Sequence, residues 1–470
     1  MRHLRYLLGF ILLAFTGTAS FAQVVSPVDF MRYNPRAAFA NASYYCDDYG
    51  YFDLGLGGIN IGMQNIGLKY DKFFRYNSAG QPMVLDLNRG LASLRDNNYL
   101  NTYAAWDIFN CGRRTKYGFF TYSHRVREWQ TFRYSKDLVK LVANGNASFL
   151  GENNPADFDV SLAARAYQEF NFGYQMSLTE QLNVGVRVKF LMGFADAKTQ
   201  NVNMQLFTDA DTYALTLKAN MDARAALPYQ LVVDENGKLK ILDKRFNVAN
   251  LFRNYGTGID LGAEYVINDQ FGVAAAINDL GFISWKNYAI QLHAGLVDAG
   301  HYYQNGGFVF QGLTNDEVQA LINDESYFDH ILDTLMQYVG FSTTTGTGYV
   351  SGLNTSMMVR GYYDLTPEHR FSAQLMGFCT GLGMRPALTL AYTGSFAEKF
   401  DVVGTYTMMP GSYDNIGIGL SAKLGGVTLY VASNNIFGFF NPTNFTQTNI
   451  QFGLSFSAGT KVKRSETIIL

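Results

Sequence analysis

The sequence predicts an all-β fold, a transmembrane antiparallel β-barrel of about 14 strands, on three observations. Segments of about ten residues in which every second residue is apolar recur from Tyr51 to the C-terminus, as in 170–176, 184–190 and 450–457. This period of two predicts strands with one apolar and one polar face. A secretory signal precedes the strands, and short turns alternate with long loops. Together these features indicate a barrel in the outer membrane of a Gram-negative bacterium.

Residues 1–22 have the pattern of a cleaved signal peptide. Two arginines start the segment, residues 6–15 are apolar, and Ser20-Phe21-Ala22 predicts cleavage before Gln23. An uncleaved membrane helix would need about 20 apolar residues, which this stretch does not supply. No later run is long and apolar enough for a spanning helix, so we expect strands to cross the membrane.

The composition agrees with a barrel. Charged residues make up 16% of the chain and aromatic residues 15%. Barrels place aromatic residues at both membrane interfaces and tolerate few prolines in their strands, and this chain has 37 Phe and 31 Tyr but only 9 Pro. The formal net charge of −2 gives no reason to expect a nucleic-acid partner.

Short turns that share one pattern, an apolar residue, a polar or charged group and an apolar residue, divide the chain into strands. We interpret the turns as periplasmic hairpins, because bacterial barrels keep that end short. They lie at 178–182, 267–271, 365–371 and 396–400, with 110–116 and 423–426 in the same role. The predicted strands are 51–62, 99–110, 115–125, 164–178, 183–195, 257–267, 271–292, 353–363, 369–378, 385–394, 400–409, 414–423, 426–433 and 449–458. This even number leaves both termini in the periplasm.

The long connections, 63–98, 126–163, 196–256 and 293–352, then lie outside the cell. Within 199–224 we expect a hairpin, and within 314–338 a helix that begins with the capping box Thr314 and Glu317. The helix has two interpretations: a gate over the barrel mouth, or an element packed on neighbouring loops for its own stability.

Three cysteines follow the signal. Cys46 comes just before the first predicted strand and Cys111 in the turn after the second, so both lie at the periplasmic end. A disulfide between them is a candidate in an oxidising compartment, and two unpaired thiols are the alternative. Cys379 falls in an external turn with no obvious partner.

Charged residues occur on the polar, lumen-facing side of neighbouring strands. Opposite charges on adjacent strands can pair inside a barrel, where an unpaired buried charge is costly. They form either a constriction that selects solutes or a satisfied network that fills the lumen. The lumen-facing candidates are Glu169, Arg187, Lys189, Asp260, Glu264 and Arg360.

No motif predicts catalysis. The sequence has no G-x-S-x-G, no His-Glu-x-x-His, no paired C-x-x-C and no Gly-rich phosphate loop. His293 and His301 flank Asp298 only at a loose spacing, which favours solvated or satisfied histidines over a metal site. We therefore expect neither an enzyme nor a cofactor, a metal site or catalytic residues.

Three motifs carry a resemblance to a known family: Asn34-Pro35-Arg36-Ala37-Ala38, the segment 278–285 and the segment 434–442. With the turn pattern, they make the mature chain resemble a family of uncharacterised outer-membrane β-barrel proteins, defined only as a domain of unknown function. More distantly, it resembles FadL-type long-chain fatty-acid transporters and the FadL-like barrels of type IX secretion. The resemblance implies fourteen strands with an N-terminal segment folded into or under the barrel.

The FadL resemblance also implies a distorted strand that opens a lateral door. The candidate is the bulge at Asp279 and Gly281, which interrupt the alternation of the seventh strand. A side opening and an ordinary bulge that redirects the strand both fit. The predicted division is 1–22 signal peptide, 23–50 N-terminal plug-like segment, 51–458 barrel and 459–470 periplasmic tail.

The resulting functional expectation is a FadL-like barrel for passive uptake of a hydrophobic or amphipathic small molecule. The alternative is a structural or assembly subunit of an outer-membrane or secretion complex that binds partner proteins through its external loops. Outer-membrane lipids surround the barrel in either case, and the ligand-binding residues are not identified by the sequence.

Overall fold

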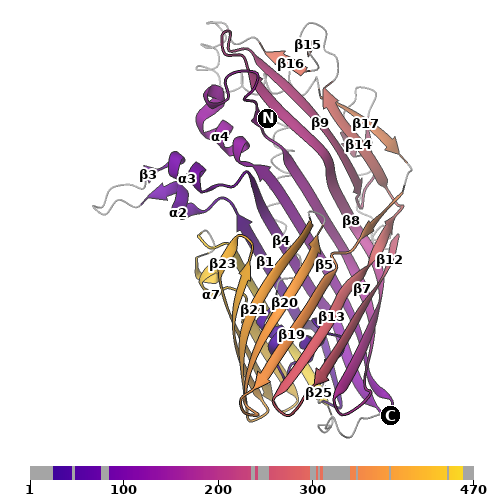
Figure 1. Ribbon diagram of the computed structural model, residues 1–470. Helices are drawn as coiled ribbons and strands as arrows, with labels where there is room; N and C mark the ends of the chain where they lie inside the picture. Colours follow the sequence, from indigo (N-terminus) through magenta and orange to yellow (C-terminus); the bar gives the residue numbers. More distant parts are fainter. Residues whose placement is uncertain are drawn as a thin grey trace.

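The computed structural model describes residues 25–44, 48–75, 84–233, 239–241, 253–296, 303–304, 307–310, 339–345, 348–380, 383–441 and 444–458. Fourteen antiparallel strands form a closed barrel, so the predicted fold class is confirmed (Figure 1). In ring order the strands are β1 (Gly50–Ile66), β4 (Asn97–Thr115), β5 (Gly118–Ser135), β7 (Val160–Ser177), β8 (Leu182–Thr208), β12 (Asn254–Val266), β13 (Phe271–Trp285), β19 (Ser356–Asp364), β20 (His369–Thr380), β21 (Gly383–Phe396), β22 (Phe400–Met409), β23 (Ser412–Leu424), β24 (Val427–Ser433) and β25 (Gln447–Ala458). Pairing of β25 with β1 closes the ring.

Each predicted strand corresponds to one of these fourteen, and the predicted short turns lie together at one end of the barrel. Several boundaries were wrong: β5 and β8 extend well past the predicted ends at 125 and 195, and one predicted strand joins two separate strands. The seventh strand was expected to run over 271–292, but β13 ends at Trp285 and a separate strand, β14 (Ala289–Leu296), follows. Between them the chain turns at Tyr288, whose φ of 54° ends the extended backbone.

The barrel sheet continues beyond the barrel wall at the end opposite the short turns, and this part is here called the extension sheet (Figure 1). β8 is longer than predicted and extends past the barrel, where β9 (Leu215–Ala226) pairs with it. The hairpin expected within 199–224 is therefore present, but its first strand is the continuation of β8. The remaining strands of this extension sheet are β14, β15 (Tyr303–Gln304), β16 (Gly307–Phe310) and β17 (Val339–Thr345).

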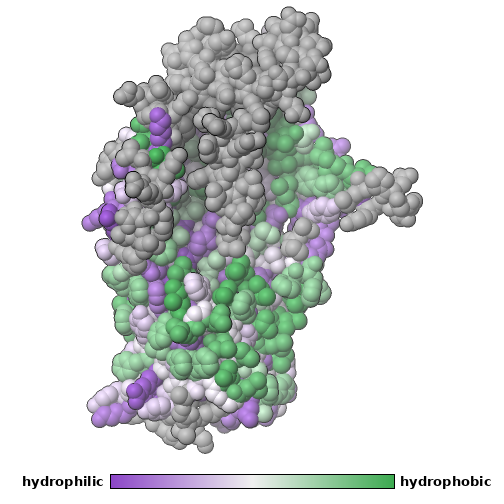
Figure 2. Space-filling view, turned by 180° about the vertical axis from the view of Figure 1, so that it is seen from behind, coloured by the Kyte–Doolittle hydropathy of each residue, from purple (hydrophilic) through white to green (hydrophobic). Residues whose placement is uncertain are grey.

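The outer face of the barrel is apolar and the inner face is polar. On β20, Phe371 and Leu375 are 48% and 58% exposed, whereas Ser372 and Gln374 between them are buried. The same alternation continues around the ring, and Figure 2 shows a predominantly hydrophobic surface over the lower part of the barrel. Such a band is what a bilayer core requires of a barrel exterior. Among the described residues, no helix is long and apolar enough to cross a membrane.

Short elements complete the described structure. Two 3-10 helices, η1 (Pro27–Phe30) and η2 (Pro35–Phe39), precede the barrel. The others are α2 (Tyr70–Phe73), β2 (Phe74–Arg75), β3 (Val84–Leu85), α3 (Leu87–Ser93), α4 (Lys136–Asn144), η3 (Gly145–Ser148), β6 (Ala156–Asp157), β10 (Leu231–Val233), β11 (Leu239–Ile241), β18 (Tyr349–Gly352) and α7 (Ile436–Phe440). The predicted signal peptide, the helix at 314–338 and the tail at 459–470 lie outside the described residues.

Candidate functional site

Residues 25–44, here called the plug, lie inside the barrel. Ser26 caps η1, because its hydroxyl accepts a hydrogen bond from the Val28 amide. The Asp29 carboxylate accepts a second hydrogen bond from the Ser26 amide, and this capping box fixes the turn locally. The apolar side of η1 then packs on the barrel wall. Together the plug and the wall form a buried cluster of Val25, Val28, Phe30, Met31, Ala276, Met358, Met376, Phe378, Ala387, Ala391, Val403, Tyr430 and Ala432.

The other half of the plug, around η2, makes polar contacts. Asn34 caps η2 and Pro35 starts it, and Arg36 follows with its side chain against β1 and β4. The Arg36 guanidinium donates from Nη2 to Asp53 on β1 at 2.8 Å and forms a second ion pair with Asp107 on β4. All three side chains are at most 5% exposed, so the plug and the wall share a buried ion-pair centre.

Wall side chains also bind the backbone of the plug. Arg187 on β8 donates to the Ala38 carbonyl at 2.6 Å, and Asn278 on β13 donates to the Ala40 carbonyl at 2.8 Å. Asp401 on β22 accepts from the amides of Arg32 and Tyr33 at 2.9 Å each. These bonds satisfy backbone groups that an irregular segment would otherwise leave unpaired.

The Arg36 centre begins a continuous chain of buried ion pairs across the lumen, here called the ion-pair chain. Five cations alternate with five carboxylates, and no member is more than 17% exposed. Formally the charges cancel, so the chain presents no net charge that would attract one sign of solute. The links are Asp53–Arg36, Arg36–Asp107, Asp107–Arg125 (2.5 Å), Arg125–Glu169 (3.4 Å), Glu169–Arg127 (3.4 Å), Arg127–Asp279 (2.9 Å), Asp279–Lys189 (2.5 Å), Lys189–Asp260 (2.8 Å) and Asp260–Arg187 (2.9 Å).

Four of the six predicted lumen residues lie in this chain: Glu169, Arg187, Lys189 and Asp260. The other two lie outside the ion-pair chain, nearer the end with the short turns. Arg360 donates to Gln374 at 2.8 Å and to the Asp29 carbonyl at 2.8 Å, and Glu264 accepts from the Tyr362 hydroxyl at 3.1 Å.

Sequence reasoning did not single out five other members, Arg36, Asp53, Asp107, Arg125 and Arg127. The last two fall at and beyond the end of the predicted third strand, which in the structure continues to Ser135. Extending the same alternation by two residues places Arg127 on the face of Arg125, so the signal was present in the pattern.

Asp279 sits at an irregularity in β13. The pairing with β12 runs to Ile277 opposite Leu261 and resumes at Leu280 opposite Ile259, so Asn278 and Asp279 share one partner residue. Asp279 has a φ of 59°, and its amide donates to Asp260 at 2.7 Å. This backbone directs its carboxylate to Arg127 and Lys189. Gly281 follows in the same strand, and its carbonyl accepts from the Leu353 amide at 2.9 Å.

Two cysteines are placed differently from the expectation. Cys379 lies within β20, opposite Met384 of β21, and not in an external turn. Cys111 lies within β4, four residues before the strand ends, and not in the turn that follows. Its neighbours across the ladder are Phe52 and Tyr122. Cys46 lies outside the described residues, so the Cys46–Cys111 disulfide remains a prediction.

The three described histidines all have local contacts. His124 pairs with Gln168 at 3.0 Å, His293 with Asp222 at 2.7 Å and His369 with the Tyr392 hydroxyl at 2.8 Å. His301 lies outside the described residues.

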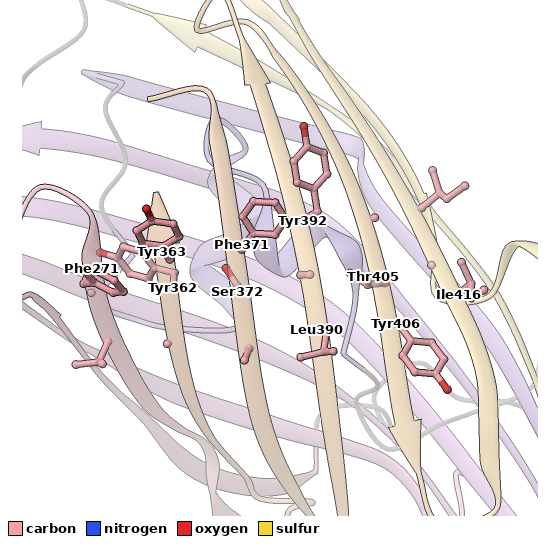
Figure 3. Close-up of a pocket in the computed structure, with 18 of the residues that line it drawn as sticks. Phe271, Tyr362, Tyr363, Phe371, Ser372, Leu390, Tyr392, Thr405, Tyr406 and Ile416 are labelled. Carbon is pink, nitrogen blue, oxygen red and sulfur yellow. The ribbon is translucent and has the colours of Figure 1, made fainter. Parts of the chain in front are cut away.

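Hollows of two kinds adjoin the barrel wall, one beside the plug and the other on the outer face. A cavity of about 300 Å³ lies between the plug and the wall at the end with the short turns, lined by polar residues that include Asp29, Arg360 and Arg370. A groove of about 870 Å³ lies on the outer face over β13 and β19–β23. In Figure 3 its aromatic side chains, Phe271, Tyr363, Phe371, Tyr392 and Tyr406, come from separate strands. The larger hollow is thus apolar and outside the lumen.

Residues 44–434 match the model of a family of unknown function, DUF5723. The chain belongs to this family. The resemblance expected from the sequence is thereby confirmed. The match begins at the last residue of the plug, so the DUF5723 model covers most of the barrel but not the plug helices. None of the curated proteins matches the sequence.

Solved structures similar to this DUF5723 protein are outer-membrane-type barrels. The Ralstonia pickettii toluene transporter TbuX has 9% identity and a TM-score of 0.41, with 94% of this chain and 95% of that chain covered. The Pseudomonas putida toluene transporter TodX has 9% identity and a TM-score of 0.38, with 94% and 95% covered. A Pseudomonas aeruginosa FadL homologue has 9% identity and a TM-score of 0.38, with 93% and 97% covered.

Proposed function

We propose that this DUF5723 protein is an outer-membrane barrel that is closed at rest and acts as an assembly subunit, binding secreted or surface proteins at its extracellular end. The observation that supports this best is the filled lumen. The plug occupies it through an apolar cluster on one side and the ion-pair chain on the other. A hydrophobic solute would have to cross ten buried charges, and their desolvation makes that route unfavourable.

The extension sheet supports the same proposal. It continues the barrel wall through β8 and orders β9, β14, β16 and β17 beyond the apolar band. An ordered sheet at this position presents a preformed surface that a partner protein can bind without first ordering the loops. Partner proteins are therefore expected at this sheet and its loops.

Native mass spectrometry on protein extracted gently from its own membrane, without overexpression, tests the proposal. We expect stoichiometric protein partners and no lipid-sized adduct. A variant in which 203–220 is replaced by a two-residue turn shortens the β8–β9 hairpin at a paired position, Asn203 opposite Asn220, and should lose the partners. A wild-type chain that always appears alone would contradict the proposal.

Plug-gated uptake of a hydrophobic or amphipathic small molecule is the second candidate. It is favoured by the cavity of about 300 Å³ beside the plug and by the polar contacts of η2, which water could replace if the plug moved. A deletion strain tests it with two probes: toluene, the substrate named for TodX and TbuX, and a long-chain fatty acid. Reduced uptake of either probe, restored by the wild-type gene, would support uptake, and unchanged rates would remove it.

A further inference from the structure

The first strand of the barrel is interrupted where it meets the plug. Against β4, pairing runs to Leu54 opposite Phe109 and resumes at Gly58 opposite Asp107, so residues 55–57 face a single residue. Against β25, pairing stops at Phe52 and resumes at Ile59. β25 itself stays regularly paired with β24 over this region. The irregularity against β25 therefore belongs to β1 and is here called the β1 bulge. On the other side, β4 has one extra residue of its own against β5, Ile108, between Asp107 and Phe109.

Arg36 of the plug fills the β1 bulge from inside. A methyl group on Gly57 or Gly58 would overlap the Arg36 guanidinium, so these two positions leave the space that the guanidinium occupies. Asp53 and Asp107, which pair with Arg36, flank the bulge on β1 and on the neighbouring strand. The backbone of β1 is thus shaped around one side chain of the plug.

The outside of the β1 bulge is held by the barrel itself. Trp106 on β4 donates from Nε1 to the Gly55 carbonyl at 2.6 Å, and Gly55 has a φ of 69° that favours glycine. At the seam, a side chain on Gly453 of β25 would overlap the Gly57 carbonyl. Without Arg36, the bulge would keep its outer contacts, but the buried carboxylate of Asp53 would lose its cation and Asp107 would keep only Arg125.

The bulge lies at the seam where the barrel closes. β1 and β25 are the first and last strands, and their pairing joins residues about 400 positions apart, as with Ile59 and Phe452. Closing a loop of this length costs more entropy than forming a hairpin between neighbouring strands, so we expect this pairing to form after the hairpins.

From these observations we infer that barrel closure depends on the plug: the β1–β25 seam closes only after Arg36 has docked in the β1 bulge. The chain cannot then form a closed barrel with an empty lumen. This inference holds whether the closed barrel binds partners or takes up a solute.

The experiment compares Arg36→Ala, Gly57→Ala and Gly58→Ala with wild type, refolded into detergent micelles. A closed barrel stays compact in SDS without heating and migrates faster than the unfolded chain, so the gel reports the closed fraction. We expect Arg36→Ala to lower the ratio of closed to unfolded chain at least about tenfold, because removing the partner of buried charges is strongly destabilising. The two glycine variants keep all charges but displace the guanidinium, and they should show the same loss.

Gly361→Ala and Gly404→Ala are the matched controls. They make the same change on barrel strands, where an added methyl group meets no atom within 4 Å, and should close like wild type. A rescue variant combines Arg36→Ala with deletion of Leu56 and Gly57, which removes the two residues of β1 that are extra against β4. Recovery of the closed band would support the inference. Wild-type closure of Arg36→Ala, or of both glycine variants, would overturn it, and neither result depends on finding a partner protein.

Discussion

At the residue scale, the central feature is how a few side chains make a charged interior compatible with a barrel. Asp279 is the clearest case. Its positive φ brings the carboxylate between Arg127 and Lys189, while its amide binds Asp260. One backbone irregularity thus connects strands β5, β8, β12 and β13. The expected bulge at this position therefore has a structural explanation in the ion-pair chain.

Asp279→Ala should destabilise the barrel by about 3–5 kcal/mol, because Arg127 and Lys189 would keep their burial and lose a shared carboxylate. Asp279→Asn separates the effect of the charge from that of the backbone conformation, since Asn tolerates the same positive φ but carries no charge. Urea unfolding in micelles, followed by the gel-mobility shift, measures both. Wild-type stability of the Asn variant would show that the charge of Asp279 contributes little.

Asp222, in the extension sheet, gives a pH prediction. Hydrogen bonds from His293 and Asn201 lower the pKa of the Asp222 carboxyl. A carboxyl whose pKa is lower in the folded state stabilises the fold above its unfolded pKa, about 3.9, and loses this contribution as the pH falls below it. Amide hydrogen exchange across β9 and β14, corrected for the intrinsic pH dependence, should therefore show no effect of Asp222 from pH 5 to 8 and faster exchange below pH 4. Asp222→Asn should remove this acceleration of amide exchange below pH 4. If the variant still showed it, another titrating group would be responsible.

At the element scale, the plug combines two kinds of contact. η1 contributes apolar surface to the wall, and η2 contributes Arg36 and carbonyl acceptors to polar side chains. The apolar contacts of η1 resist separation in water, whereas the hydrogen bonds of η2 can be exchanged for hydrogen bonds to water at a lower cost in free energy. The two halves should therefore differ in local stability.

Met31→Ala tests the apolar half. Met31 is 1% exposed in the plug–wall cluster, and truncating a buried Met to Ala costs about 2–5 kcal/mol. Hydrogen exchange by mass spectrometry should show faster exchange in η1 and unchanged exchange in β9 of the extension sheet, which serves as the internal control. Equal acceleration in both regions would indicate that the plug is not a separate unit of stability.

At the scale of the whole molecule, the barrel divides into an apolar outer band, a charged but balanced interior and an ordered sheet beyond one end. The outer groove in Figure 3 belongs to the band, because its lining is mainly aromatic and aliphatic and Gly404 beside Tyr406 opens to the outside. A membrane location predicts that lipid fills this groove.

Gly404→Trp tests this location. In vesicles that contain brominated phospholipid, the added tryptophan should be blue-shifted and quenched relative to the three native tryptophans alone. Asn146→Trp, in the short helix η3 near the extension sheet, should not be quenched. Equal quenching at the two positions would contradict the assignment of the apolar band.

The sequence by itself determined which residues form strands, how many strands there are and which end has short turns. These properties are local, since a period of two fixes the two faces of a strand and a few residues fix a turn. The same period placed Glu169, Arg187, Lys189 and Asp260 on the inner face. Arg127 lies beyond the predicted end of its strand, and Arg36 lies in a segment that forms no strand. For these two residues the sequence did not predict the ion-pair partner.

Only the tertiary structure decided that these charges form one chain, that Glu264 and Arg360 lie apart from it, and that the extension sheet continues from β8. The reason is that ring closure brings together strands such as β5 and β13, which are not neighbours in the sheet, through side chains that meet in the lumen. Partners across a lumen have no fixed spacing in the sequence. They depend on strand tilt, on bulges such as those in β1 and β13, and on the segment that fills the space between the walls.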